Sequence, residues 1–213
     1  MTPRKPNQPT LTKNQIIEAA MAIVDLDGLG RLSMRRLARH LGMSPMSLYY
    51  HIPDKSALYD SILDVVMSEV DLSGDDRGKP VEERLIVVGH ALRDALLAHP
   101  NAVTLALSRS LHTEAQLRPV EAILAMLSDA GLSPSDAMGI VNIMGQYILG
   151  TAAAYANHVV ENELHRSVQE EDFAALATES FPHTTRAVSE ADYVGFEEDF
   201  DRGLRALVRG LLS

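Results

Sequence analysis

The chain has 213 residues, of which 46% are hydrophobic and 5% aromatic, and it contains neither cysteine nor tryptophan. The absence of cysteine excludes disulfides, thiolate zinc sites and cysteine nucleophiles, and the predominance of aliphatic residues favours helices over sheets. The net charge of -10 argues against nucleic-acid binding by the chain as a whole, but it is unevenly distributed. Residues 1–60 hold eight Lys or Arg and five Asp or Glu, a net charge of +3, which leaves -13 for the remainder. A basic head on an acidic body fits contact with phosphate groups through the head alone.

The first ten residues are polar and rich in proline, without the apolar core of a signal peptide. We expect a flexible arm over 1–10. No uninterrupted apolar run reaches the roughly 18 residues that a membrane-spanning helix needs. These features predict a soluble cytoplasmic protein that makes no membrane contact.

A first helix is predicted over about 12–27. Thr12 is suited to the N-cap position, and Gln15 three residues later completes a capping box. Gly28 and Gly30 then end the helical pattern. Between them the apolar residues recur at the spacing of one helix face, which we expect to be buried; they are Ile16, Ala19, Ala20, Ile23 and Val24.

The stretch 32–55 predicts two short helices joined by a tight turn. Gly42 supplies the left-handed residue that ends the first helix, and Ser44 caps the second. Pro53 stops the second helix, and Asp54 caps the next one along the chain. Two short helices with a turn of about three residues are typical of a helix-turn-helix unit.

The second of these helices carries an unusual outward set of hydroxyl, methionine, tyrosine and histidine side chains. A helix-turn-helix places its second helix in the major groove of DNA. Hydroxyls can hold phosphate oxygens, and a tyrosine ring can also meet a thymine methyl group. The candidate DNA-binding residues are Arg35, Ser44, Pro45, Met46, Ser47, Tyr49, Tyr50, His51 and Lys55. Two short amphipathic helices also abut in many proteins that bind no DNA, but the outward set and the basic head favour DNA binding.

Beyond the head, residues 71–80 form the clearest linker, and longer, more apolar helices follow it. The stretch 164–188 is polar and irregular. The expected helices are 81–98, a short one over 101–110, one ending at Ala130, a long one over 134–162, a short one near 170–179 and a final one from Ser189 with an apolar stripe starting at Tyr193. The fold class is therefore all-α. The expected division is a three-helix DNA-binding head over 1–53, a connecting helix over 54–70 and a body over 71–213.

Residues 11–66 resemble the DNA-binding head of the tetracycline-repressor (TetR) family. The similarity is carried by LTKNQIIEAAMAIVDLDGLGRLSMRRLARHLGMSPMSLYYHIPDKSALYDSI, and LYYHIPDK is especially close to the family signature. By position, the resemblance implies that Arg35, Ser47, Tyr49, Tyr50, His51 and Lys55 contact DNA and that Pro45 and Met46 approach the bases. It also implies a homodimer whose two heads meet successive major grooves, about 34–36 Å apart.

The body resembles the ligand-binding and dimerisation domain of the tetracycline-repressor branch over LRDALLAHP, HTEAQLRPVEAILAMLSDAGLSPSDA and GQYILG. This implies dimerisation through the helices near 134–162 and 190–212. It also implies a small-molecule pocket between the helices over 81–98, 114–130 and 134–162. By position, the lining residues are Val88, Leu92, Val120, Ile123, Leu124, Met138, Val141, Asn142 and Gln146.

The chain departs from that branch at the magnesium–tetracycline site, which uses histidines and a polar amide. The matching positions hold Asp71, Leu107, Ile123 and Gln146. Leucine cannot ligate a metal and isoleucine cannot make the hydrogen bonds of an amide, so we expect no metal, no cofactor and no magnesium–tetracycline binding. An apolar lining with Asn142 as a second polar anchor beside Gln146 indicates a hydrophobic or amphipathic ligand. The alternative is that these side chains simply fill a core.

No catalytic constellation is visible. The histidines lack the H-E-x-x-H spacing of a metal site, and Ser108 and Ser110 lack the glycines of a nucleophile elbow. We therefore expect a homodimeric transcriptional repressor that is released from a palindromic operator by a small ligand, and not an enzyme. Two alternatives stay open: a regulator whose body binds a protein partner, and a helical enzyme that binds a small molecule.

Overall fold

The computed structural model describes residues 11–175, 180–190 and 195–213, with side chains described over 11–156, 180–186 and 195–213. Within these residues every regular element is a helix, which confirms the all-α class. The helices are α1 (Lys13–Asp27), α2 (Met34–His40), α3 (Pro45–His51), α4 (Lys55–Ser68), α5 (Val81–Ala98), α6 (Val103–Ser108), α7 (Glu114–Asp129), α8 (Pro134–Ala175), α9 (Pro182–Glu190) and α10 (Phe196–Leu211), with 3-10 turns η1 (Leu29–Arg31) and η2 (Pro100–Ala102).

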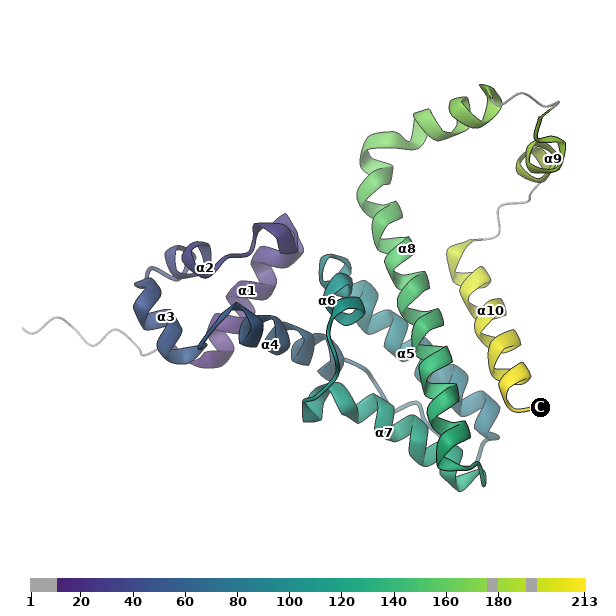
Figure 1. The fold of residues 1–213 in the computed structure, drawn as a ribbon, viewed down its shortest axis with the longest axis horizontal. Coiled ribbons are helices and arrows are strands. Elements are labelled where there is room, and N and C mark those ends of the chain that lie inside the picture. The colour runs from purple at the N-terminus through teal and green to yellow at the C-terminus, as the bar shows by residue number, and fades with distance from the viewer. Residues whose placement is uncertain (1–10, 176–179, 191–194) are drawn as a thin grey trace, which may run out of the picture.

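Helices α1, α2 and α3 form the head (residues 11–53), which lies to one side of the molecule (Figure 1). Both halves of the predicted capping box are present: Gln15 N–H donates to Thr12 Oγ1 at 3.3 Å, and Thr12 N–H donates to Gln15 Oε1 at 2.9 Å. Gly28 ends α1 with a φ of 81°, in the left-handed region that favours glycine. The three helices bury a shared apolar core that includes Ile16, Ala20, Val24, Leu37, Leu48 and Ile52.

The turn between α2 and α3 has the predicted chemistry. Gly42 has a φ of 65°, and Met43 N–H donates to the carbonyl oxygen of Ala38 at 2.9 Å, which closes the end of α2. Ser44 Oγ accepts from Ser47 N–H at 3.1 Å and caps α3. Because these caps are local to the chain, the orientation of α3 on the head follows from the turn residues and from the burial of Leu48.

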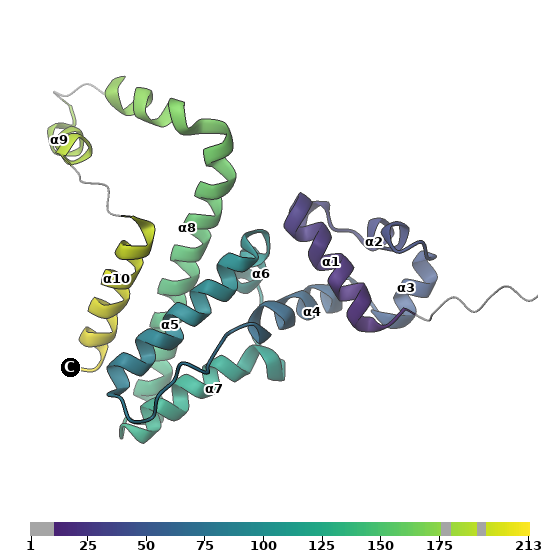
Figure 2. The same ribbon diagram turned by 180° about the vertical axis from the view of Figure 1, so that it is seen from behind.

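The connecting helix α4 leads from the head into the body, where it packs chiefly on α7 (Figures 1 and 2). In the body, α5 and α7 pack on α8, and α10 lies against both α5 and α8. Gly89 on α5 allows one of these close approaches, since a Cβ there would meet Leu204 Cδ2 of α10 at 2.7 Å. The body core is thus a set of helices packed side by side around α5 and α8.

Three expectations about helix bounds were wrong. The long helix does not end near 162 but continues to Ala175, and residues 170–175 are its last turns instead of a separate short helix. The polar stretch after Ala156 contains good helix formers and no glycine or proline before Pro182, so nothing in it breaks the helix. Ser189 lies in α9, and α10 begins at Phe196; Tyr193 and residues 176–179 lie outside the described residues.

The short helix expected over 101–110 is divided into η2 and α6. One helical stretch, Pro134–Ala156 of α8, is long and apolar enough to cross a membrane by length and composition, although it has no uninterrupted apolar run. A core helix of a soluble protein meets the same test. The inner face of this stretch packs on α5, α7 and α10, which covers only part of its apolar surface.

Candidate nucleic-acid interface

Helix α3 exposes large side chains that a solvated helix face would not carry. Tyr50 is 90% exposed, Met46 is 81% exposed and Tyr49 is 45% exposed, whereas Leu48 is fully buried in the head core. Exposed apolar and aromatic residues on one short helix mark a contact surface for another molecule. The structure therefore brings the predicted base-approaching and phosphate-contacting residues of α3 to the same outward side.

Ser44 and Ser47 are both exposed at the start of α3, but their hydroxyls are not independent donors. Ser44 Oγ and Ser47 Oγ lie 2.8 Å apart, so one hydroxyl hydrogen is used between them. A single hydroxyl hydrogen of the pair is left to meet an oxygen on another molecule. The sequence indicated two separate donors at this end, whereas the structure shows a coupled pair.

The remaining candidate residues surround α3. Arg35 is exposed on α2, and Pro45 is exposed at the first position of α3. His51 is half-buried, with its ring edge-on to Tyr50 at a centroid distance of 5.7 Å. Lys55 is exposed at the start of α4, with its Nζ 5.1 Å from the centroid of the Tyr59 ring.

Not every arginine of α2 is available. Arg36 forms an ion pair with Asp27 at the end of α1 and so fastens α2 to α1. Arg35 and Arg39 are exposed, as is Arg31 in the turn before α2. The basic charge of the head is therefore divided between a structural pair and exposed residues that can meet phosphates.

The nine predicted lining residues of the body differ in burial. Val88 and Ile123 are buried in the hydrophobic core. Leu92, Val120, Leu124 and Val141 are half-buried, and three residues of α8 are exposed: Met138, Asn142 and Gln146. The two polar anchors thus lie on an outer face of α8, while the apolar residues that precede α8 in sequence pack inward.

A depression of about 390 Å³ lies at another place, between the end of α4, the linker and α5. It shares none of the nine predicted lining residues. Its lining residues are Glu69, Asp71, Gly74, Val87, His90, Ala91, Asp94, Ala95 and Ala98. Three acidic residues and a histidine in the lining distinguish this depression from the largely apolar pocket that the resemblance implies.

The residues at the branch's metal-site positions do not fit magnesium with tetracycline. Leu107 and Ile123 have no donor atoms, and Asp71 uses a carboxylate oxygen to accept from Ser73 N–H at 2.9 Å. That hydrogen bonding to Ser73 lowers the pKa of Asp71. Within the described residues, no group of three or more His, Cys, Asp or Glu is placed to hold a metal ion.

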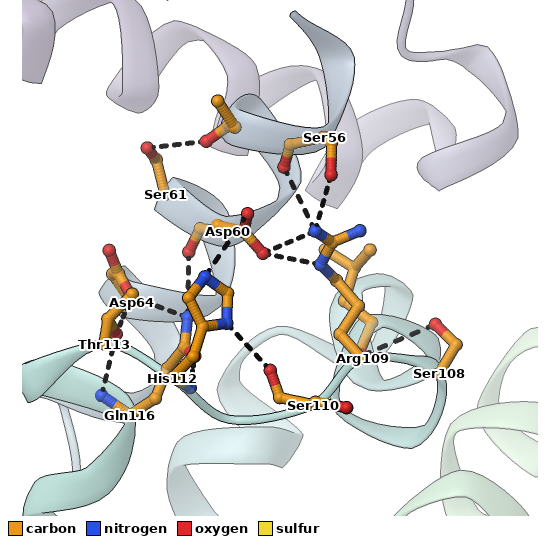
Figure 3. Close-up of polar contacts among 12 residues, drawn as sticks. Ser56, Asp60, Ser61, Asp64, Ser108, Arg109, Ser110, His112, Thr113 and Gln116 are labelled. Atoms are coloured by element: carbon orange, nitrogen blue, oxygen red, sulfur yellow. Dashed lines mark hydrogen bonds and ion pairs between the residues drawn. The ribbon is translucent and has the colours of Figure 1, made fainter.

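A polar network joins the connecting helix α4 to the segment from the end of α6 to the start of α7 (Figure 3). Arg109 donates from Nε to Asp60 Oδ1 at 2.7 Å and from Nη2 to Ser56 Oγ at 2.8 Å. One turn further along α4, Asp64 Oδ1 accepts from Thr113 Oγ1 at 2.6 Å and from Gln116 Nε2 at 2.7 Å. Gln116 is fully buried, so this network is part of the packed contact between α4 and the body.

Helix α7 also holds the C-terminal end of α4. Arg118 of α7 donates to the carbonyl oxygens of Ser68 and Val70 at 3.1 and 2.9 Å. Sequence reasoning did not find these contacts, because Arg109 is separated from Asp60 by 49 residues and Gln116 from Asp64 by 52. The one local signal was Thr113, which caps α7 through Gln116 N–H while its own hydroxyl donates to Asp64.

Comparison with known proteins identifies the family. Residues 16–62 match the model described as "Bacterial regulatory proteins, tetR family", and residues 75–213 match "Tetracyclin repressor-like, C-terminal domain". The chain belongs to the TetR family. Members of this family are transcriptional regulators with a helix-turn-helix head, so this TetR-family chain is a DNA-binding regulator and not an enzyme.

The similarity to known proteins extends along nearly the whole chain. An HTH-type transcriptional regulator of Saccharopolyspora erythraea is 32% identical over 97% of this chain and 86% of that protein. Tetracycline repressor protein class D of Escherichia coli is 27% identical over 94% of this chain and 88% of that protein. The crystal structure of apo ActR from Streptomyces coelicolor is 26% identical with a TM-score of 0.79, and 97% of each chain is covered. ActR has also been solved in complex with (S)-DNPA, with a TM-score of 0.80 over 96% of this chain and 98% of that chain at 26% identity.

Proposed function

We propose that this TetR-family regulator is a cytoplasmic homodimeric repressor, released from a palindromic operator by a small hydrophobic or amphipathic ligand. Residues 1–53 act as the DNA-binding head, 54–70 as the connecting helix and 71–213 as the ligand-binding and dimerisation body. The observation that carries the proposal is the outward face of α3, where Met46 and Tyr50 are almost fully exposed beside Tyr49. Large apolar side chains exposed together on one helix indicate a surface that a partner covers. The positive charge of the head favours a partner rich in phosphate groups.

The homodimer is supported by the open face of α8. On this helix Ile143 is 41% exposed and Met138 is 44% exposed, and Gly150 further along is exposed as well. Among the residues that the structure describes, a Cβ built at Gly139, Gly145 or Gly150 would meet no atom within 4 Å, so no described contact requires a glycine there. Each glycine costs a helix about 1 kcal/mol relative to alanine. Close approach of a partner helix gives these glycines a use, as it does at many helix–helix interfaces.

Release by a ligand needs a connection from the body to the head, and the network on α4 supplies one. Arg109 holds Ser56 in the first turn of α4 and Asp60 in the second, and Ser56 directly follows the DNA-contact candidate Lys55. A ligand that moved the end of α6 would therefore move α4 and, through it, the head. Because two heads meet half-sites about 34–36 Å apart, a shift of a few ångströms prevents simultaneous docking.

The DNA-binding part is tested by selecting duplexes from a random library with the purified protein. We expect a palindromic site with two half-sites about 10 base pairs apart and a complex that contains two protomers. A protein with Tyr49→Ala and Lys55→Ala serves as the matched control and should retain little binding. Selection of no duplex, or of a single half-site bound by one protomer, would contradict the proposal.

The ligand-binding part is tested with actinorhodin as the probe, because ActR has been solved in complex with it, and with tetracycline plus magnesium as the contrasting probe. We expect actinorhodin to raise the melting temperature and to weaken operator binding, and tetracycline with magnesium to do neither. A probe that raised the melting temperature but left operator affinity unchanged would contradict release by a ligand. If a protein fraction released the regulator from its operator and no small molecule did, a body that binds a protein partner would be favoured instead.

Homodimerisation is tested by sedimentation of Ile143→Arg, which places a charge on the open face of α8. We expect this variant to sediment as a folded monomer. The control is Leu26→Arg on α1, where Leu26 is 83% exposed and far from α8 in sequence. A dimer that persisted in Ile143→Arg as in Leu26→Arg would contradict the assigned interface.

A further inference from the structure

His99, which directly follows α5, lies between the head and the end of the connecting helix. Its Nδ1 is 3.1 Å from each carboxylate oxygen of Asp25 in α1, and its Nε2 is 3.0 Å from Oε2 of Glu69, the residue that ends α4. Asn101 in η2 adds a hydrogen bond from its Nδ2 to the carbonyl oxygen of Asp25 at 3.0 Å. The head is thus attached to the body directly at this point, in addition to its covalent attachment through α4.

The protonation state of His99 decides whether both of these contacts can exist. A neutral imidazole has one N–H donor and one lone-pair acceptor, whereas an ionised carboxylate can only accept. Both ring nitrogens face carboxylates, so the two contacts are made together only by the doubly protonated imidazolium. Loss of one proton sets a lone pair against one carboxylate and breaks either the link to Asp25 or the link to Glu69.

The carboxylates that face His99 are those of Asp25 and Glu69, and further charged groups lie near Glu69. Asp71 of the linker and Asp94 of α5 line the same depression as Glu69, and His90 of α5 lines it too. On α7, the positively charged Arg118 donates to the carbonyl oxygens of Ser68 and Val70, on either side of Glu69. In α1, Asp27 is paired with Arg36. Helix α8 also packs on η2, and between residues 134 and 156 its one charged residue is Asp136 in the first turn.

His99 is also well enclosed. Its side chain is 16% exposed, while those of Asp25 and Glu69 are 39% and 43% exposed. The carboxylates can therefore turn to water when a contact is lost, but the ring cannot easily leave. Histidine is the side chain whose charge normally changes between about pH 5 and 8. The bridge is thus able to open by movement of the head while the ring stays in place.

We propose that His99 is a positioning residue for DNA binding: its imidazolium ties Asp25 of the head to Glu69 of α4, and its deprotonation frees the head to change orientation on the body. The inference rests on the proposed function, because orientation matters when two heads must meet fixed half-sites. It adds a proton-dependent control to the ligand-dependent one. The control acts through α1, whereas the ligand acts through α4.

The test compares the wild type with His99→Gln, which is neutral at all pH values, and His99→Arg, which keeps a positive charge and several donors. The chain has no cysteine, so spin labels can be attached at Arg39→Cys in the head and Glu121→Cys in the body, both exposed positions. Labelled protein is diluted into an excess of unlabelled protein, and pulsed electron resonance gives the head–body distance distribution without DNA. Thermal unfolding of each variant confirms that it is folded.

We expect the wild-type distribution to be narrow at about pH 6 and to become broad or shifted at about pH 8.5. His99→Arg should stay narrow at both pH values, and His99→Gln should be broad at both. Distributions that are the same for wild type and His99→Gln at both pH values would overturn the proposal. A wild-type distribution that does not change with pH would do so as well.

A second measurement uses a duplex selected in vitro and gives its dissociation constant across the same pH range. His99→Arg and His99→Gln should differ at least about threefold in affinity, and the wild type should move from the His99→Arg value toward the His99→Gln value as the pH rises. Comparison with His99→Arg removes the contributions of His40 and His51, which are present in all three proteins. Equal affinities of the two variants would overturn the role in DNA binding. If no duplex is selected, the proposed function fails, and the distance measurement still decides whether the bridge exists.

Discussion

Tyr147 on α8 lies directly against the backbone of Gly203 on α10, so that a Cβ at Gly203 would collide with the phenol oxygen and its ring carbon. The Tyr147 hydroxyl donates to the carbonyl oxygen of Phe200 at 3.1 Å, and the two rings stack with centroids 5.5 Å apart. Burial raises the pKa of the Tyr147 phenol, so it stays a neutral donor throughout the physiological range. This contact sets how closely α10 approaches α8.

Gly203→Ala should therefore destabilise the protein. Overpacking typically costs about 1–3 kcal/mol, against about 1 kcal/mol gained by placing alanine instead of glycine in a helix. To isolate the effect of the collision, the free energy of unfolding lost through Gly203→Ala is measured by chemical denaturation in the wild type and in the Tyr147→Phe background. We expect the substitution to cost at least about 0.5 kcal/mol less in the Tyr147→Phe background. Equal costs in both backgrounds would show that Tyr147 does not limit the approach of α10.

The linker is fastened to the body by a paired interaction between Asp75 and Arg84. Arg84 donates from Nε to Oδ1 at 2.6 Å and from Nη2 to Oδ2 at 2.9 Å, and the side chains are only 18% and 9% exposed. Hydrogen bonding from Arg84 lowers the pKa of Asp75. A carboxylate with a lowered folded-state pKa contributes stability that is present above its unfolded value, about 3.9, and is lost as the pH falls through the folded value.

Asp75→Asn should thus lower the free energy of unfolding by about 1–3 kcal/mol at pH 7. The difference from the wild type should shrink as the pH falls from about 4 through the lowered folded-state pKa of Asp75, where the wild-type carboxylate becomes protonated too. Glu121→Gln, at an exposed position of α7, is the control for removing one negative charge. If the free energy of unfolding lost in Asp75→Asn did not depend on pH, the ion pair would not be the cause of the loss.

Arg109→Met should weaken the attachment of α4 to the body. The substitution keeps an apolar stem and removes the donors to Asp60 and Ser56, which leaves Asp60 with His112 at 3.7 Å as its remaining ionic partner. We expect the free energy of unfolding, measured by chemical denaturation, to fall by about 1–3 kcal/mol. We also expect any effector to have a weaker effect on operator binding. Arg202→Met is the control, because Arg202 pairs with Asp199 on the exposed surface, where such pairs contribute about 0–1 kcal/mol.

The roles of the α3 residues are separable by salt and by sequence. Lys55→Ala and Tyr49→Phe should weaken binding to all duplexes, and Lys55→Ala should reduce the slope of log affinity against log salt by about one. Met46→Ala and Tyr50→Ala should instead change which duplex is preferred. Repeating the in vitro selection with each variant measures both effects. If all four variants kept the wild-type preference and lost affinity alike, the division into phosphate and base contacts would be wrong.

The head could be predicted almost completely from its sequence. The capping box at Thr12, the left-handed Gly42 and the serine cap at Ser44 all lie within a few residues of the groups that they satisfy. The bounds of α5, Val81–Ala98, also agree with the expected range 81–98. The prediction was wrong after Ala156, where a polar stretch without glycine or proline continues α8 to Ala175 instead of ending it. Polarity alone does not end a helix when its residues are good helix formers.

The sequence by itself determined where the helices of the head begin and end, which of their faces are apolar and that one short helix carries an outward tyrosine pair, because these properties depend on neighbours within one or two turns. Only the tertiary structure decided that Arg109 holds Asp60, that His99 joins Asp25 to Glu69 and that Tyr147 meets Gly203. The first two contacts span 49 and 74 residues, and no local rule pairs such residues. The structure also placed Asn142 and Gln146 on an outer face of α8. Which side of a helix meets another is settled by the packing of the whole body, where burial of the apolar faces outweighs the preference of any single residue.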